Sequence, residues 1–248
     1  MAKIHMILQG KGGVGKSFIS STLAQHKFSK GGNPLCIDTD PVNATFFGFK
    51  KLNVKQINVM NNDEIDPRKF DDLIELIAKA DNDVIIDNGA STFVPMSHYL
   101  ISNQIPALLL DMGHELVVHT VITGSQALLD TLNGFVHLIK QFPKEALFVV
   151  WLNPYWGEIS MNGKQFEEMK AYVDNKARVS AIIRIPHYKP ETFGKDLSEI
   201  LQSKFTFDEA LKNSALPVMV RQRLTIIRRQ LFTNIENVAA VLTRVMTN

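Results

Sequence analysis

The octapeptide at residues 10–17, Gly-Lys-Gly-Gly-Val-Gly-Lys-Ser, constrains the fold of this chain more than any other segment. It satisfies the pattern G-x-x-x-x-G-K-[ST] at every fixed position, between an apolar run, Ile4–Leu8, and a helical pattern, Lys16–Lys30. The glycines allow consecutive N–H groups to face phosphate oxygens, and the positive end of the following helix adds to that attraction. We therefore expect a nucleotide-binding loop, with Lys16 at the β- and γ-phosphates and the Ser17 hydroxyl at Mg²⁺. The residues expected to line it are Gly12, Gly13, Val14, Gly15, Lys16, Ser17 and Phe18.

Short apolar runs alternate with longer helical patterns along the whole chain. The predicted strands are Ile4–Leu8, Pro34–Asp38, Val84–Asp87, Ala107–Asp111, Leu116–Ile122, Leu147–Leu152 and Val179–Ile183. The predicted helices are Lys16–Lys30, Pro67–Ala80, Ser125–Phe142, Gly163–Lys176, Thr192–Leu201 and Val218–Met246. Most of the strands are unbroken apolar runs, which is typical of strands covered on both faces. The pattern predicts a single α/β domain over residues 1–248, a doubly wound, mostly parallel sheet with helices on both faces.

Composition narrows the classes of function. The chain has 248 residues, of which 21% are charged, and its net charge is only +2, which argues against disorder and against a strongly basic nucleic-acid-binding protein. The single cysteine, Cys36, can form no internal disulfide, and no Cys/His cluster has metal-ligand spacing, which fits a reducing cytosol. No apolar run approaches the roughly 20 residues needed to cross a bilayer, and the N-terminus has no signal-peptide pattern. We expect a cytoplasmic protein without membrane contact.

Acidic residues follow two of the predicted strands. Asp38 and Asp40 end the run that begins at Pro34, and their spacing of two places both side chains on one face of an extended chain. The strand Val84–Asp87 ends in an aspartate that is able to order Mg²⁺ through its water ligands. Gly89 follows it and permits a close approach of the backbone to a γ-phosphate. Because the carboxyl ends of parallel strands meet at one edge, these residues should share a crevice with the phosphate loop.

The loop contains a second lysine, Lys11, which a phosphate loop does not need for its own nucleotide. Residues 11–16, Lys-Gly-Gly-Val-Gly-Lys, resemble the K-G-G-x-G-K loop of the ParA/MinD family of partitioning and positioning ATPases, which have a phosphate-loop NTPase fold of the SIMIBI kind. The resemblance implies a slow, partner-stimulated ATPase that binds ATP, ADP and Mg²⁺. It also implies a homodimer that forms on ATP binding, in which Lys11 reaches the nucleotide of the other subunit. Like an arginine finger, a cation supplied in trans would stabilise charge in the transition state.

The same resemblance gives roles to the acidic residues. Asp40 would position or activate the attacking water, and Asp38 would help to hold the magnesium shell beside Ser17 and Asp87. The sequence departs from the family after Pro41, because residues 42–45, Val-Asn-Ala-Thr, stand where the family has Gln-Gly-Asn-Ala-Thr.

Two later segments resemble the part of the family that contacts the base. Asn153 lies just past an apolar strand, where the family's asparagine reads the adenine amino group, although asparagine is also common in turns before proline. Pro186 lies in a segment whose backbone would contact the base. For the neighbouring aromatic residues, Trp151, Tyr155 and Trp156, core packing is favoured over contact with adenine or with a partner.

A narrower resemblance is to a protein of plasmid conjugal transfer within the family. It is carried by Met1–Met6, Pro34–Thr45, Asp83–Ser91, Asp111–Thr120, Phe148–Gly157 and Arg221–Phe232. This resemblance implies a role in bacterial conjugation or plasmid maintenance, with a protein of the conjugation machinery as a partner.

The predicted C-terminal amphipathic helix, at about residues 218–246, carries an apolar stripe and, between residues 221 and 229, a group of four arginines. The stripe steps by three or four residues through Val220, Leu224, Ile227, Leu231, Ile235, Val238, Leu242 and Val245. The arginines, which scatter around the helix, are Arg221, Arg223, Arg228 and Arg229. We favour a core-packed helix with solvated or paired arginines over nonspecific contact with DNA phosphates and over a membrane-surface helix.

Two functions remain open from the sequence. The first is an ATP-driven dimeric switch that binds DNA or a conjugation component and releases it on hydrolysis. The second is a nucleotide-binding scaffold or regulator with little turnover. An iron–sulfur reductase is excluded, because such proteins need bridging cysteines. The histidines His5, His114 and His119 have no acid or cysteine partner at ligand spacing, and we expect them to be structural.

Overall fold

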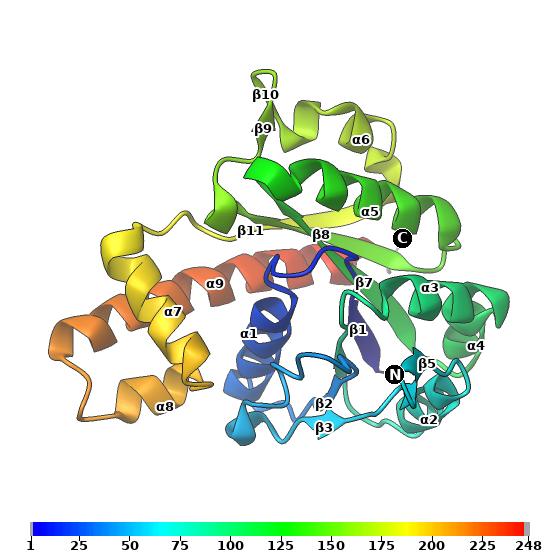
Figure 1. Cartoon of the computed structure of the whole chain (residues 1–248), viewed down its shortest axis with the longest axis horizontal. Helices are drawn as coiled ribbons and strands as arrows, with labels where there is room; N and C mark the ends of the chain where they lie inside the picture. The colour runs from blue at the N-terminus through cyan, green and yellow to red at the C-terminus, as the bar shows by residue number, and fades with distance from the viewer. Residues whose placement is uncertain (1, 246–248) are drawn as a thin grey trace.

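The computed structural model describes residues 2–245, with side chains through residue 239. At its centre lies a seven-stranded sheet in which every pair of neighbouring strands is parallel (Figure 1). In sheet order the strands are β11 (Val179–Arg184), β8 (Leu147–Asn153), β7 (Glu115–Thr123), β1 (Lys3–Ile7), β6 (Val84–Asp87), β2 (Leu35–Asp38) and β3 (Lys55–Gln56). The predicted doubly wound, parallel sheet is confirmed.

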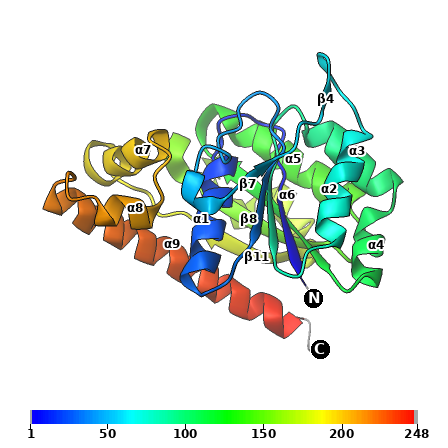
Figure 2. The same ribbon diagram turned by 90° about the horizontal axis from the view of Figure 1, so that it is seen from below.

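Helices cover both faces of this sheet (Figure 2). On one side lie α1 (Lys16–Ser29), α7 (Lys195–Gln202), α8 (Phe207–Lys212) and α9 (Val218–Val245). On the other side lie α2 (Lys69–Ala78), α3 (Phe93–Ser102), α4 (Ile105–Asp111), α5 (Leu128–Gln141) and α6 (Lys170–Val173). Alternating side chains of β1 enter the two cores, Ile4 and Met6 on the side of α5 and Ile7 on the side of α1. None of the helices within residues 2–245 is long and apolar enough to cross a membrane.

The predicted strand Ala107–Asp111 is wrong, because this segment forms helix α4. Pro106 stands in the first turn of the helix, where its missing N–H costs no intrahelical hydrogen bond. Ile105 and Leu109, four residues apart, are both buried, whereas Leu108 is exposed. An apolar run of this length has no clear period, so a short strand and a short helix look alike in the sequence.

The predicted helix Gly163–Lys176 is also largely wrong. Its first residues form strand β10 (Lys164–Gln165), which pairs with β9 (Ser160–Met161) in a hairpin. A 3₁₀ turn at Phe166–Glu168 follows, and only the four residues of α6 are α-helical. Gly163 has a φ of 76°, a left-handed conformation that suits the turn of the hairpin and not the start of a helix. Another small hairpin, β4 (Met60–Asn61) and β5 (Glu64–Ile65), and helices α3 and α8 were not predicted.

Helix α9 packs as its apolar stripe predicts. Leu224, Ile227 and Leu231 are completely buried in the core beneath the sheet, and Ile235 is nearly so. Val220 and Val238 are half-buried against the same core. Of the residues predicted for this helix, Met246 lies outside the described residues, as do the side chains of Leu242 and Val245.

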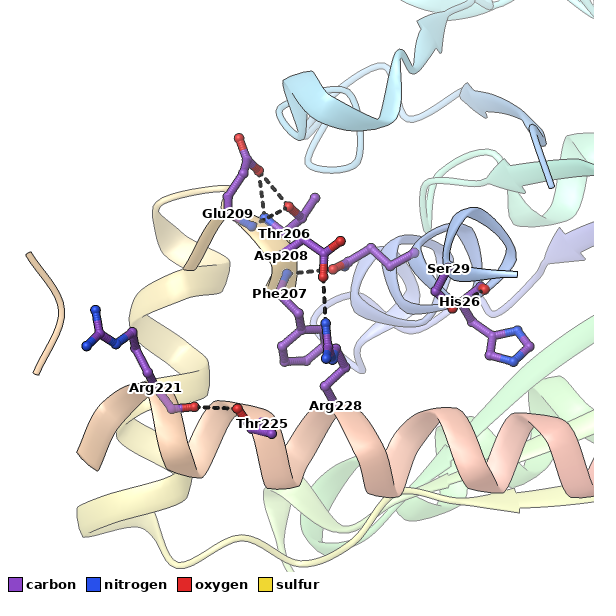
Figure 3. Close-up of polar contacts among 10 residues, drawn as sticks. His26, Ser29, Thr206, Phe207, Asp208, Glu209, Arg221, Thr225 and Arg228 are labelled. Carbon is purple, nitrogen blue, oxygen red and sulfur yellow. Dashed lines mark hydrogen bonds and ion pairs between the residues drawn. The ribbon is translucent and has the colours of Figure 1, made fainter. Parts of the chain in front are cut away.

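Three of the four arginines between residues 221 and 229 of α9 are held by groups within the chain. Figure 3 shows the Nη1 atom of Arg228 donating to Oδ1 of Asp208, at 2.6 Å, which ties α9 to α8. Arg223 forms an ion pair with Asp196 of α7, and Arg221 donates to the carbonyl oxygen of Asn213 at 3.2 Å. These contacts support the core-packed helix with paired arginines and weaken the case for contact with DNA through this helix.

A buried chain of two histidines and a tryptophan links three neighbouring strands. The Nε1 atom of Trp151 donates to Nδ1 of His119 at 2.9 Å, so the other ring nitrogen of His119 carries the proton that it donates to Nδ1 of His5, also at 2.9 Å. The Nε2 atom of His5 has no hydrogen-bond partner among the described residues. Burial, followed by the positive charge of Lys27, lowers the pKa of His119 to about 3, and burial lowers the pKa of His5 well below its usual value. Both rings are therefore neutral and structural, as expected.

We expect these two histidines to make the fold sensitive to mild acid. In the unfolded chain each ring binds a proton below a pH of about 6.5, whereas in the folded chain neither does, so stability present above that pH is lost as the pH falls towards 3. Each histidine should lower the free energy of unfolding by about 1.4 kcal/mol between pH 7.5 and pH 5.5. Urea unfolding at both pH values checks this, with His119→Gln as the comparison, because glutamine does not titrate and can still accept from Trp151. The expected result is a smaller loss in the variant, and equal losses in both proteins contradict it.

Candidate functional site

The phosphate loop joins the end of β1 to the start of α1. Gly13 and Gly15 have φ values of 72° and 101°, in the left-handed region, and Gly15 is the N-cap residue of α1. A Cβ atom on Gly15 would lie 2.7 Å from the Nδ2 atom of Asn153, and one on Gly10 would lie 2.9 Å from the ring of Phe93. Gly13 and Gly15 therefore have backbone angles that favour glycine, and Gly10 and Gly15 stand where a Cβ atom would be too close to a neighbouring side chain.

Lys16 is the buried cation of the loop. Its side chain is only 8% exposed, and its Nζ atom donates to the carbonyl oxygen of Lys11 at 3.0 Å. Burial lowers the pKa of this ammonium group, while the negative charges of Asp87 and Asp40 act in the opposite direction. A desolvated cation at the amino end of a helix is suited to bind an anion such as a phosphate group.

Two buried carboxyl groups lie side by side at the ends of β2 and β6. Burial, and then the negative charge of Asp38, raises the pKa of Asp87 to about 7, while hydrogen bonds from Ser17 and Ser20 act in the opposite direction. The Ser20 hydroxyl donates to Oδ1 of Asp87 at 2.9 Å. Burial likewise raises the pKa of Asp38. A pair of buried carboxyl groups with raised pKa values is suited to a cation beside it, and Ser17 and Asp87 offer the oxygen donors that Mg²⁺ prefers.

Asp38 organises the segment that follows β2. Its Oδ1 atom accepts from the backbone N–H of Asp40, and its Oδ2 atom accepts from that of Phe47, each at 2.9 Å. Asp40 also binds backbone N–H groups that follow it in the chain: its Oδ1 atom accepts from those of Val42 and Asn43, at 2.9 and 3.0 Å. Both oxygens of the Asp38 carboxylate therefore accept from backbone N–H groups of the segment that follows β2. The Asp40 carboxylate fixes the backbone of residues 42 and 43, where the sequence departs from the family pattern.

Asp40 and Gly89 are in direct contact. A Cβ atom on Gly89 would lie 2.7 Å from both Cγ and Oδ1 of Asp40. The sequence predicts that Gly89 permits a close approach of the backbone to a phosphate group. In the structure, the group that lies close to Gly89 is the Asp40 carboxylate. The segments after β2 and after β6 therefore touch at the edge of the site, as expected from the parallel sheet.

A cavity of about 1250 Å³ opens at this edge of the sheet. It is large enough for a nucleoside triphosphate. The predicted site residues that line it are Gly12, Gly13, Gly15, Lys16, Ser17, Phe18, Asp40, Asn153 and Pro186. Asp38 and Asp87 lie behind its wall, because both are buried. The structure therefore brings the phosphate loop, the acidic residues and the predicted base segments together.

Lys11 lies on the outside of the loop. Its Nζ atom is 2.7 Å from Oδ2 of Asp130 on α5, and both side chains are well exposed, at 44% and 55%. Together with Gly10 and Val94 they line a smaller hollow of about 420 Å³, separate from the nucleotide cavity. Lys11 thus points away from the cavity that its own loop lines, and Asp130, which no sequence motif marks, is its partner.

The residues after β8 contact the loop from the other side. The Nδ2 atom of Asn153 donates to the carbonyl oxygen of Val14 at 2.9 Å, and its Oδ1 atom accepts from the N–H of Tyr155 at 3.2 Å. Trp151 is completely buried, as expected. Tyr155 and Trp156 are 68% and 53% exposed, so the expected core packing is wrong for both. The turn that follows Asn153 carries them out of the sheet and over the loop.

Comparison with known proteins gives a family for nearly the whole chain. Residues 5–246 match the description "CobQ/CobB/MinD/ParA nucleotide binding domain". Two curated relatives from Escherichia coli, each called "Protein TraL", are both 66% identical to this chain. The first alignment covers 97% of this chain and all of the relative, and the second covers 98% and all of it.

Solved structures of two MinD proteins have a similar fold. The MinC:MinD cell division protein complex of Aquifex aeolicus matches 94% of this chain and 96% of its own, with a TM-score of 0.53 and 14% identity. The cell division ATPase MinD of Pyrococcus furiosus matches 96% of this chain and 99% of its own, with a TM-score of 0.50 and 18% identity. At these identities the similarity is one of fold.

Proposed function

The chain belongs to the CobQ/CobB/MinD/ParA nucleotide-binding family, and on this premise we propose that it is an ATP-dependent dimeric switch that serves plasmid conjugative transfer or plasmid maintenance. The observation that carries the proposal is the shared cavity of the phosphate loop, Lys16 and Asp40. The role in plasmid biology rests on the identity of 66% to the two TraL proteins.

ATP would bind with its phosphate groups along the loop. The loop offers N–H groups, the positive end of α1 and the Lys16 ammonium, and all three attract phosphate oxygens. Ser17 and Asp87 would hold Mg²⁺, which when bound neutralises charge on the phosphate groups. Phe18 and Pro186 would border the base, since both line the cavity beyond the loop.

Asp40 is the residue that we propose to position the attacking water. Its carboxylate is half-buried at the wall of the cavity, and its Oδ1 atom is engaged with the backbone of residues 42 and 43. A carboxylate fixed in this way can orient a water beside a γ-phosphate by accepting a proton from it.

A homodimer is supported by the surface around the loop. Several large apolar side chains are exposed there or on the elements that flank it, and these are Val42, Val94, Leu129, Tyr155 and Trp156. Exposed apolar side chains around a binding site are typical of a surface that meets a partner. We propose a second copy of this chain as that partner, with Lys11 of each subunit directed at the nucleotide of the other.

The variant Asp40→Asn tests the hydrolytic part of the proposal. Asparagine keeps an oxygen that can accept from Val42 and Asn43, but it has no negative charge to take a proton. We expect nucleotide affinity to remain within a few-fold of the wild type and the rate of ATP hydrolysis to fall by about 10²- to 10⁴-fold. Phosphate release assays and calorimetry measure the two quantities. The control is Asp63→Asn, an exposed acid in the β4–β5 hairpin.

Two outcomes of these assays would change the proposal. If Asp40→Asn hydrolyses ATP like the wild type, the water is positioned by another residue. If the wild type binds ATP but does not hydrolyse it, with or without DNA, the scaffold function is favoured. A pull-down with ATP-bound Asp40→Asn, in which the dimer persists, would then separate DNA from a protein of the conjugation machinery as the partner.

A further inference from the structure

Among the described residues, side chains donate hydrogen bonds to three carbonyl groups in the stretch of the phosphate loop that precedes α1, residues 10–15. The indole Nε1 of Trp156 donates to the carbonyl oxygen of Gly13 at 3.0 Å, and the Nδ2 atom of Asn153 donates to that of Val14 at 2.9 Å. The third donor is Lys16, which belongs to the loop itself and donates to Lys11. Two of the three donors therefore come from one turn after β8, about 140 residues further along the chain.

These bonds determine where the N–H groups of the loop can point. A trans peptide group is planar, and its C=O and N–H bonds point in opposite directions. The Gly13 carbonyl shares a peptide group with the N–H of Val14, and the Val14 carbonyl shares one with the N–H of Gly15. Holding each oxygen from outside the loop therefore fixes the opposite direction of the N–H group that follows it. Glycine-rich loops bind phosphate through such N–H groups, so their orientation decides the affinity.

We propose that Trp156 and Asn153 are positioning residues that hold the phosphate loop in its anion-binding conformation. Gly12, Gly13 and Gly15 leave this backbone unusually free to rotate, so without an external constraint part of the binding free energy would be spent on ordering it. Trp156 is exposed and makes its hydrogen bond from the rim, whereas Asn153 is buried beneath the loop. The inference rests on the proposed nucleotide site, and it assigns to these two side chains an effect on affinity that acts through the loop.

A role of Asn153 in positioning the loop and a role in recognising adenine predict different effects on ligand affinity when Asn153 is replaced. Both polar atoms of the Asn153 side chain are already engaged, one with Val14 and one with Tyr155. A residue that orders the loop should affect every ligand that carries the phosphate groups, whatever its base. A residue that reads adenine should affect ATP and leave GTP and inorganic triphosphate unchanged.

The experiment compares ATP, GTP and inorganic triphosphate, each with Mg²⁺, by calorimetry on the full chain. The variants are Trp156→Phe, which keeps a ring but has no N–H donor, and Asn153→Leu, which has a similar volume, no charge and no donor for Val14. We expect each variant to weaken all three ligands by a similar factor, about two- to tenfold, which is the net effect of one hydrogen bond. The control is Glu158→Gln, because Glu158 is exposed just after the same turn, accepts from Gln165 through an oxygen that glutamine keeps, and does not line the cavity.

Tryptophan fluorescence gives a second readout that a purely structural role would not change. The chain has two tryptophans, and Trp151 is completely buried in the core while Trp156 lies against the loop. Inorganic triphosphate should therefore change the emission of the wild type and leave that of Trp156→Phe unchanged. Equal thermal unfolding midpoints of the wild type and Trp156→Phe would show that the loss of affinity does not arise from unfolding.

Four outcomes would count against the inference. Unchanged affinity of both variants for all three ligands overturns it, while the nucleotide site itself stands. A loss confined to ATP in Asn153→Leu would show that Asn153 reads adenine and does not position the loop. Tighter binding by Trp156→Phe would show that the indole opposes the binding conformation. If the wild type binds none of the three ligands, the proposed function is wrong and this inference is wrong with it.

Discussion

Replacement of Lys16 by alanine is expected to abolish detectable binding of ATP. The Lys16 ammonium group is buried at the amino end of α1, and its negative neighbours Asp87 and Asp40 are the residues that we assign to Mg²⁺ and to the attacking water. Hydrogen bonds to charged groups contribute about 1.5–3 kcal/mol each, so the loss of two to the phosphate groups should weaken binding by about 10²- to 10⁴-fold. Calorimetry with ATP and Mg²⁺ measures this directly.

The control for this experiment is Lys27→Ala. Lys27 lies on the same helix and forms an ion pair with Asp83 at 2.5 Å, but it does not line the cavity. Its replacement should leave nucleotide affinity unchanged. The nucleotide-free Lys16→Ala protein should be no less stable than the wild type, because the variant removes a buried cation whose desolvation opposes folding. Unchanged ATP affinity in Lys16→Ala would place the nucleotide site elsewhere.

The sequence predicted those parts of the site that are formed by residues adjacent to one another in the chain. The phosphate loop and Asp87 each follow an apolar strand directly, so the strand places them at the carboxyl edge of the sheet. The predicted segment Ala107–Asp111 failed because seven residues of helix are too few to show a period.

Contacts between residues far apart in the chain could not be predicted in this way. Asp130 meets Lys11 across 119 positions, and Trp156 meets Gly13 across 143. Nothing in the local sequence distinguishes Asp130 from other acids on a helix surface. For Trp156 a signal is present, since it follows the Asn-Pro turn after β8, but an aromatic residue beside an apolar strand is more often packed in the core.

Lys11 is expected to act on the nucleotide of a second subunit. Its side chain lies outside the cavity of its own loop, 2.7 Å from Asp130, in a position where both groups are exposed. An exposed ion pair of this kind contributes only about 0–1 kcal/mol, so Lys11 can leave Asp130 at little cost. In the proposed function, Lys16 already binds the phosphate groups within its own subunit. In a two-fold dimer the contact from Lys11 to the partner's nucleotide would occur twice, which would make dimerisation depend on the γ-phosphate.

Replacement of Lys11 by alanine should therefore remove dimerisation and turnover together. We expect the ATP-dependent dimer to be lost and hydrolysis to fall by about 10³- to 10⁵-fold, as for the loss of an arginine finger, while the affinity of the monomer for nucleotide changes little. The companion variant Asp130→Asn removes the charge that holds Lys11 in the single subunit, and it should dimerise at least as well as the wild type. Sedimentation with a slowly hydrolysed ATP analogue measures dimerisation, and calorimetry measures affinity. If Lys11→Ala dimerises like the wild type, or loses nucleotide as completely as Lys16→Ala, Lys11 acts within its own subunit and the proposed dimer is wrong.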